Sequence, residues 1–127
     1  MDADRLKRIP LFAQLSHREL AQIGRWADEL EVGEGRHIVD QGDFGYEFFA
    51  ILDGTAEVLK DGERIATLGP GDFFGEIALE SGGRRTASVV ASAPMHVAVM
   101  LKRDFRHMEA DLPEVADMVR RAIEERS

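Results

Sequence analysis

The segment that decides the fold is AEVLKDGERIATL, residues Ala56–Leu68. Two short runs containing valine, leucine, isoleucine and threonine flank the pair Asp61-Gly62. An Asp-Gly pair between such runs is the strongest short-range signal for a two-residue β-hairpin, because both turn residues must adopt positive φ. The segment therefore predicts an antiparallel hairpin, with strands over residues 56–59 and 64–68.

Short strands separated by glycines are predicted on both sides of this hairpin, over residues 35–101. Glycine occurs at positions 42, 45, 54, 62, 69, 71 and 75, which is a turn signal roughly every ten residues. The other runs with strand character are residues 36–39, 47–52, 88–91 and 96–101. Many short antiparallel strands at even spacing are typical of a small barrel or jelly roll. We therefore expect a mainly β core.

The residues before this core, residues 1–30, are predicted to be helical. Ser16 followed three positions later by Glu19 is a capping box, which starts a helix. Apolar residues then recur at helical spacing. They are Leu20, Ile23, Ala27 and Leu30. We expect Gly33 and Gly35 to end this helix.

The residues after the core are predicted to form two more helices. The first covers residues 102–110, and the second begins near Pro113, since proline is favoured in the first helical turn. The second helix carries an apolar stripe opposite a charged face. The stripe consists of Leu112, Val115, Ala116, Val119, Ala122 and Ile123. The expected fold class is therefore α+β, mainly β, with helices at both ends.

Length and composition restrict the class of protein. The 127 residues suit one domain, divided into residues 1–33 with the N-terminal helices, residues 34–101 with the strands, and residues 102–127 with the C-terminal helices. Cysteine is absent, and we find no long apolar run and no secretory signal. The net charge of −8 disfavours nucleic acid and anionic membranes as partners. We therefore expect a cytoplasmic domain without direct membrane contact.

A second segment carries the functional signal: FGEIALESGGRRTASV, residues Phe74–Val89. Residues 77–79 have room for a single helical turn, whose first N–H groups lack helical partners and favour an anion. Arg85 returns to the same place after a Gly-Gly bend, and a guanidinium beside such N–H groups suits a phosphate. The small residues Thr86 and Ala87 would let the anion approach the main chain.

Glu76 in the same segment cannot serve a phosphate, because like charges repel. A carboxylate suits a hydroxyl donor instead, such as a ribose 2′-OH. Phosphate, sugar hydroxyl and a nearby apolar surface together describe a nucleotide. The structural alternative is a salt bridge between Glu76 and Arg85 beneath a loop.

Taken together, these motifs resemble a known family. The chain looks like the cyclic nucleotide-binding domains of catabolite activator proteins, protein kinase A regulatory subunits and cyclic-nucleotide-modulated channels. The resemblance covers about residues 11–123 and rests on the phosphate-binding cassette, residues 74–88, in which FGEIAL is followed by RTAS. Glycines matching the family's β-roll are Gly35, Gly42, Gly54, Gly71 and Gly75. The resemblance implies an eight-stranded antiparallel β-roll, a double-stranded jelly roll, flanked by N-terminal and C-terminal helices.

The resemblance also implies which residues would bind a cyclic nucleotide. Arg85 would pair with the phosphate, and the Thr86 hydroxyl with nearby N–H groups would complete the anion site. Glu76 and the main chain of Gly75 would hold the 2′-OH. The purine would lie on the strands, and a side chain from Met118 to Ile123 would close over it. The full implied set is Gly75, Glu76, Ile77, Ala78, Arg85, Thr86 and Ala87, with Val58, Ala66 and Leu68 under the purine and Met118 and Ile123 above it.

The function implied is that of a regulatory sensor domain and not of an enzyme. Ligand binding would shift a population of helix positions, which a partner would sense. The expected ligand is cAMP; cGMP stays open, because the hydroxyl of Thr86 is the one guanine-specific signal. The effector would be another protein or a domain outside this sequence, and a homodimer stays open. No metal or other cofactor is expected, and Arg84 is expected to be solvated.

Two alternatives remain for the function. A domain of the same fold could lack a ligand and serve protein–protein interaction alone. A cupin-type metalloenzyme is also a small β-barrel, but it needs two or three histidines converging from paired strands. Only His37 and His96 lie on predicted strands, and no His-x-His pattern is present. The sequence therefore disfavours the metalloenzyme.

Overall fold

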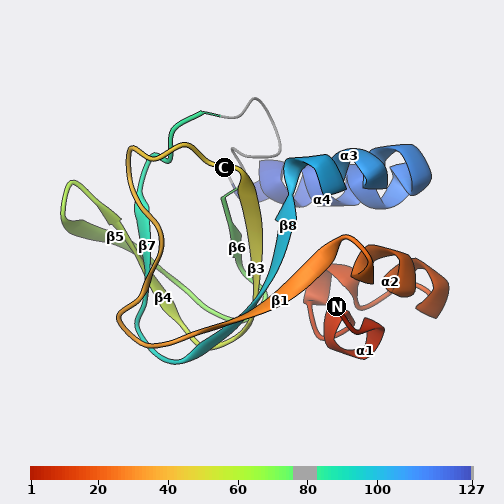
Figure 1. The fold of residues 1–127 in the computed structure, drawn as a ribbon, viewed down its shortest axis with the longest axis horizontal. Helices are drawn as coiled ribbons and strands as arrows, with labels where there is room; N and C mark the ends of the chain where they lie inside the picture. Colours follow the sequence, from red (N-terminus) through yellow and green to blue (C-terminus); the bar gives the residue numbers. More distant parts are fainter. Residues whose placement is uncertain (76–82, 127) are drawn as a thin grey trace.

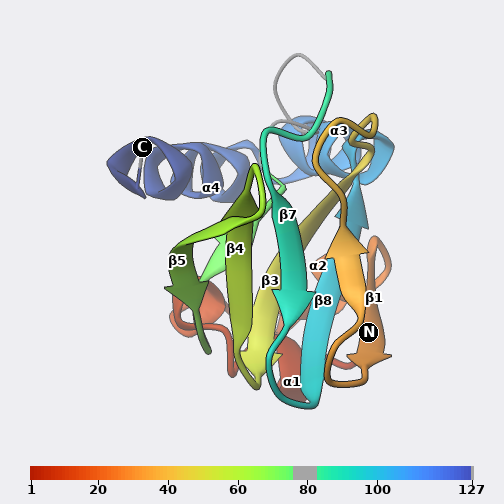
Figure 2. The same ribbon diagram turned by 90° about the vertical axis from the view of Figure 1, so that its left-hand side faces the viewer.

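The computed structural model describes residues 1–75 and 83–126. Within these ranges, eight strands form two antiparallel four-stranded sheets, in the orders β1-β8-β3-β6 and β2-β7-β4-β5. The strands are β1 (Ala27–Val32), β2 (His37–Val39), β3 (Glu47–Asp53), β4 (Ala56–Lys60), β5 (Glu63–Leu68), β6 (Phe73–Phe74), β7 (Ser88–Ala91) and β8 (Met95–Leu101). The two sheets face each other as a roll, with helices at one side (Figures 1 and 2). The predicted fold class is confirmed.

The hairpin predicted from the opening segment is present as β4 and β5. Lys60 pairs with Glu63, and the two residues between them have positive φ, 52° for Asp61 and 82° for Gly62. The turn is also held from outside the hairpin. The side-chain amide of Gln41 accepts a hydrogen bond from the Asp61 main chain at 2.9 Å and donates to its carboxylate at 3.0 Å.

The helices lie before β1 and after β8. They are α1 (Ala3–Leu6), the 3-10 helix η1 (Pro10–Phe12), α2 (His17–Gly24), α3 (Lys102–Asp111) and α4 (Pro113–Arg126). The capping box is confirmed, since the Glu19 N–H donates to the Ser16 hydroxyl at 3.1 Å and the Ser16 N–H donates to the Glu19 carboxylate at 2.9 Å. No helix within the described ranges combines the length and the apolar composition needed to cross a membrane.

The prediction that the helix beginning after Ser16 continues to Leu30 is wrong. Helix α2 ends at Gly24, and residues from Ala27 onward form β1, which pairs with β8. Ala27 packs against the helices, whereas Leu30 packs inside the roll, so these residues lie on opposite faces of a sheet. Their spacing matched a helix by coincidence. The expected helical segment 1–33 therefore includes a strand.

Strand β6 is also absent from the strands that the sequence pattern predicts. It contains Phe73 and Phe74 only, which pair with Ala50 and Phe49 of β3. Two residues are too few to show an alternating pattern. The six strands that were predicted are all present, and their ends differ from the predicted ones by one residue at most.

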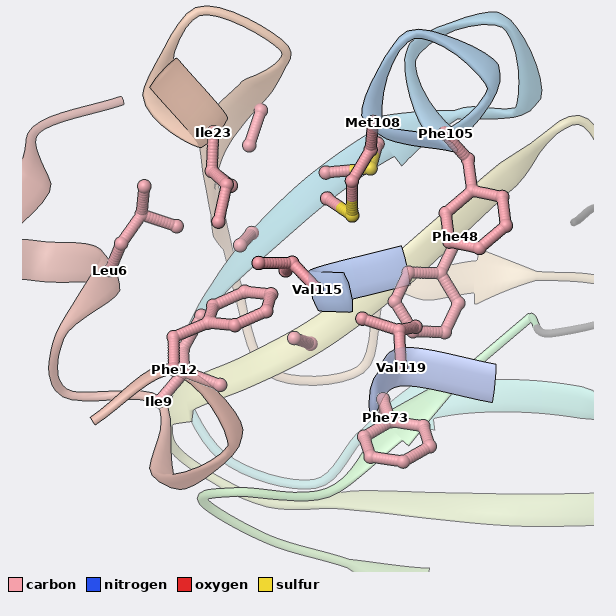
Figure 3. Packing of buried hydrophobic residues seen from close by; sticks show 14 of the residues in the cluster. Leu6, Ile9, Phe12, Ile23, Phe48, Phe73, Phe105, Met108, Val115 and Val119 are labelled. Carbon is pink, nitrogen blue, oxygen red and sulfur yellow. The ribbon is translucent and has the colours of Figure 1, made fainter. Parts of the chain in front are cut away.

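Two apolar clusters pack on opposite faces of the β1-β8-β3-β6 sheet. The helix-facing cluster joins this sheet to the helices and includes Phe48, Met108 and Val119 (Figure 3). The roll cluster fills the space between the sheets and includes Phe49 and Val97. The predicted stripe of α4 lies in the helix-facing cluster.

Candidate functional site

Arg85 occupies an unusual position for a charged residue. Its exposed fraction is 6%, and among the described residues it is the one charged residue that is buried. Burial of a guanidinium is costly unless its environment compensates the charge or supplies hydrogen-bond acceptors. The structure around Arg85 must therefore supply acceptors or an opposite charge for this group.

The main chain of Arg85 is fixed by an antiparallel contact with residues 42–45. The Arg85 N–H donates to the Asp43 carbonyl at 2.6 Å, and the Arg85 carbonyl accepts from the Gly42 N–H at 2.9 Å. The Gly45 N–H donates to the Gly83 carbonyl at 2.9 Å. These hydrogen bonds set the direction in which the Arg85 side chain leaves the backbone.

The Arg85 guanidinium lies close to two glycines, Gly45 shortly before β3 and Gly75 directly after β6. Its Nη2 donates to the Glu47 carbonyl at 2.8 Å. A Cβ at Gly45 would lie 2.7 Å from the guanidinium carbon, and a Cβ at Gly75 would lie 2.8 Å from Nη1. Contacts between carbon atoms are normally about 3.5–4.0 Å. The main chain can approach the guanidinium this closely only because both positions lack a side chain.

The neighbouring Arg84 is exposed, as expected, but it also makes specific contacts. Its Nη1 donates to the Gly42 carbonyl at 2.9 Å, and its guanidinium lies 4.6 Å from the centre of the Phe44 ring. Phe44 is itself 57% exposed. The two adjacent arginines therefore differ: Arg85 points inward, and Arg84 lies across the outer surface of residues 42–44.

The other predicted members of the phosphate site are only partly described. Gly75 lies beside Arg85, with a φ of 81°, in the left-handed region that favours glycine. Thr86 is exposed and Ala87 is half-buried, directly before β7. Glu76, Ile77 and Ala78 lie outside the described residues.

The three residues expected under the purine lie on the hairpin strands β4 and β5. Val58 pairs with Ala66, and Leu68 pairs with Ala56. Val58 is half-buried at the edge of the roll cluster, Ala66 is exposed, and Leu68 is buried. Val58 and Ala66 therefore form an accessible apolar surface, while Leu68 supports it from the core.

Strand β4 of the hairpin lies beside the start of β7, at the end of the roll where residues 85–87 enter that strand. Leu59 of β4 pairs with Ser88, the first residue of β7. The Gln41 N–H donates to the Ser88 hydroxyl at 2.9 Å, while the Gln41 side chain holds Asp61 at the hairpin turn. The structure thus places β4, which carries Val58, beside β7, which directly follows residues 85–87.

Met118 and Ile123 lie elsewhere in the described structure. Both belong to the helix-facing cluster, where Ile123 is buried and Met118 is partly buried. Neither belongs to the roll cluster, which contains Val58. In the described structure these two α4 side chains therefore pack with the helices and not with the strand residues expected under the purine.

The histidines expected on strands do not form a metal centre. His37 lies 2.8 Å from Asp40 on the surface, and His96 lies 3.6 Å from both Glu31 and Asp53. His37 is in β2 and His96 in β8, in different sheets. Across the described ranges, no group of three or more histidine or acidic side chains is suited to a metal ion.

Sequence reasoning missed the segment that holds Arg85. Gly45 was interpreted only as a turn signal, Gly42 as a turn signal and a glycine of the β-roll, and neither Asp43 nor Glu47 was linked to the site. Asp43 and Glu47 contact Arg85 through main-chain carbonyls, and every residue type has such a carbonyl. The residue types at these positions therefore do not indicate the contact. The available signal was Gly45, since a glycine can mark a close approach of another group to the backbone.

Comparison with known proteins identifies the family. A family model described as the cyclic nucleotide-binding domain matches residues 29–111. A cAMP-dependent protein kinase regulatory subunit of Mycosarcoma maydis is 36% identical over 121 residues, covering 88% of this chain and 23% of that protein. A cyclic nucleotide-gated potassium channel of Rhizobium etli is 33% identical over 118 residues, covering 93% of this chain and 33% of that protein.

A solved structure agrees with these sequence matches. The Thermus thermophilus catabolite activator protein superposes with a TM-score of 0.82 at 28% identity, covering 92% of this chain and 57% of that chain. The chain spans no more than 33% of the length of the two relatives named above. The chain belongs to the cyclic nucleotide-binding domain family.

Proposed function

We propose that this chain is a regulatory domain that binds a cyclic nucleotide, with cAMP as the preferred ligand. The observation that carries the proposal is the buried Arg85 guanidinium, fixed against the Glu47 carbonyl between two glycines. A pre-positioned guanidinium suits a phosphate because its planar set of N–H donors matches two phosphate oxygens. The net charge of −8 opposes anion binding, so the site must act locally.

The remaining roles in the proposed site follow from position. The Thr86 hydroxyl and the main chain at Ala87 adjoin Arg85 and would donate to the same phosphate. Val58 and Ala66 present an apolar surface at the same end of the roll and would support the purine. Glu76, with the main chain of Gly75, would hold the ribose 2′-OH, while Ile77 and Ala78 would complete the cassette. This chemistry requires no metal or other cofactor.

The proposed output is a change in the position of α4. In this structure Met118 and Ile123 pack in the helix-facing cluster. A ligand that contacts α4 in a second position more strongly than in this one would shift the population toward that position. An effector protein, or an effector domain beyond this chain, would respond to the shift. The names of the relatives, a kinase regulatory subunit and a gated channel, support a regulatory role. A location in the cytoplasm and a role without catalysis are part of the proposal.

The experiment that tests this proposal is calorimetric titration with cAMP and, separately, with cGMP. A charge-assisted hydrogen bond contributes about 1.5–3 kcal/mol, so Arg85→Ala should weaken cAMP binding roughly tenfold to a hundredfold. The matched control is Arg84→Ala, which removes the same group from the adjacent exposed position and should leave affinity close to unchanged.

Three results would contradict the proposal in different ways. An unchanged affinity in Arg85→Ala would show that the phosphate site is wrongly assigned. Tighter binding of cGMP than of cAMP would reverse the ligand preference. No heat with either nucleotide, in protein free of carried-over nucleotide, would leave protein–protein interaction as the function of the fold.

A further inference from the structure

Gly45 lies in the described structure where an ordinary side chain would overlap Arg85. A Cβ built at this position would lie 2.7 Å from both the guanidinium carbon and Nε, and 2.9 Å from Nη1. All three distances are well below normal contact distances of about 3.5–4.0 Å. Any residue other than glycine at position 45 must therefore displace the guanidinium or the backbone.

Backbone conformation does not require glycine at this position. Gly45 is absent from the glycines with positive φ, whereas Gly75, on the other side of the guanidinium, has a φ of 81°. A substitution at Gly75 would strain the backbone and crowd Arg85 at once. A substitution at Gly45 would change only the space available to Arg85.

The surroundings leave the guanidinium little room to move aside. The backbone at Gly45 is fixed by its N–H, which donates to the Gly83 carbonyl at 2.9 Å. A Cβ at Gly75 would lie 2.8 Å from Nη1, so the main chain on that side is equally close. A methyl group at position 45 would therefore disturb the contact at 2.8 Å between the guanidinium and the Glu47 carbonyl.

We propose that Gly45 is a positioning residue for Arg85: the absence of a side chain at position 45 creates the space in which the guanidinium is held against the Glu47 carbonyl. Its consequence for ligand binding rests on the proposed function, in which Arg85 binds the phosphate of a cyclic nucleotide. The contact itself exists without ligand and can be tested without it.

The test is a double-mutant cycle that combines Gly45→Ala with Arg85→Ala. Thermal unfolding is measured for all four proteins without ligand, and cAMP titration for the wild type and the two single variants. Gly33→Ala is the matched control, because Gly33 also has an ordinary φ and nothing lies within 4 Å of a Cβ built there. If Arg85→Ala does not fold, Arg85→Leu replaces it, because leucine keeps part of the apolar stem and lacks the guanidinium.

The expected result is that the effect of Gly45→Ala depends on Arg85. In the wild-type background Gly45→Ala should lower the unfolding temperature by several degrees and weaken cAMP binding at least about tenfold, as loss of a charge-assisted hydrogen bond implies. In the Arg85→Ala background it should leave the unfolding temperature unchanged, because the group that the methyl displaces is gone. Gly33→Ala should change neither property.

Other results separate this inference from the proposed function. An equal loss of unfolding temperature in both backgrounds would overturn the inference, since residue 45 would then act on the fold and not on Arg85. Unchanged cAMP affinity in Gly45→Ala, with weak binding in Arg85→Ala, would overturn the inference and keep the function. Coupling in the unfolding temperatures without cAMP binding in any protein would support the positioning role and reject the proposed function.

Discussion

Two pairs of phenylalanines lie on opposite faces of one sheet, and each member of one pair is the sequence neighbour of a member of the other. Phe48 and Phe73 pack in the helix-facing cluster with ring centres 5.7 Å apart and planes tilted by 47°. Phe49 and Phe74 pack in the roll cluster, stacked at 4.8 Å and 12°. Each pair joins β3 to β6. Neighbouring residues of a strand point to opposite faces of the sheet, so a shift of one position decides which of the two clusters a phenylalanine stabilises.

The two faces of this sheet support different parts of the proposed mechanism. On the roll face, a Cβ built at Gly75 would lie 3.5 Å from the Phe49 ring, so Phe49 borders the glycine that contacts Arg85. On the other face, Phe48 belongs to the same cluster as the α4 residues Val115 and Val119. Ligand binding is therefore expected to depend on the roll face, and the position of α4 on the helix-facing cluster.

The largest expected effect comes from opening a cavity in the helix-facing cluster. Met108 of α3 is completely buried, so Met108→Ala should destabilise the protein by about 2–5 kcal/mol. Its cAMP affinity should not fall, because Met108 lies outside the roll cluster. Urea unfolding measures the first quantity and titration the second.

The control for this variant is Ile65→Ala. Ile65 is 59% exposed, so its removal should change stability by no more than about 0.5 kcal/mol. A loss of cAMP affinity in Met108→Ala as large as that in Arg85→Ala would show that the two faces are not separable.

A smaller and more direct test uses the two phenylalanines themselves. Phe48→Leu and Phe49→Leu should each cost about 1–2 kcal/mol, because both remove buried ring atoms from packed clusters. Only Phe49→Leu should weaken cAMP binding, since it alters the support beneath Gly75. The comparison of the two faces fails if both variants lose affinity equally.

The smallest effect concerns an ion pair at the edge of the helical side. Arg5 of α1 donates to both carboxylate oxygens of Glu29 on β1, at 3.0 and 2.9 Å. The hydrogen bond from Arg5, followed by its charge, lowers the pKa of Glu29, and the same hydrogen bond raises the pKa of Arg5. Because the pKa of Glu29 is lower in the folded state, the pair stabilises the protein above the ordinary carboxyl pKa of about 4.3.

This stabilisation should disappear as the pH falls through the lowered pKa of Glu29. Glu29→Gln should therefore lower the unfolding temperature slightly at neutral pH and make little difference in strongly acidic buffer. Glu34→Gln, at an exposed position of the adjoining turn, is the control and should change little at either pH. An equal effect of Glu29→Gln at both pH values would show that the side chain acts through packing instead of charge.

The elements that the sequence predicted correctly have strong local causes. Asp61-Gly62 can form the hairpin turn because this pair tolerates positive φ at both positions. The Ser16–Glu19 box closes through contacts between residues three positions apart. The prediction for residues 27–30 was wrong because Ala27 and Leu30 are buried in different apolar clusters, on opposite faces of the sheet. Those faces exist only because β1 pairs with β8.

The candidate site also contains features that the sequence indicates and features that only the folded structure shows. The sequence pointed to Arg85 by residue type and by its place after the Gly-Gly bend. It could not indicate the carbonyls of Asp43 and Glu47, because every residue has a carbonyl and only folding brings these two to Arg85. Gly45 was visible as a glycine, but its steric role depends on a residue 40 positions later in the chain.

The sequence by itself determined the family, the number and kind of most elements, and the residue that carries the proposed phosphate contact. These properties follow from local spacing, turn chemistry and a contiguous motif. The tertiary structure alone decided which main-chain carbonyls hold Arg85, which face of the sheet each phenylalanine serves, and where the side chains of α4 lie. Those outcomes depend on contacts between segments that are distant in the sequence, and local spacing does not specify such contacts.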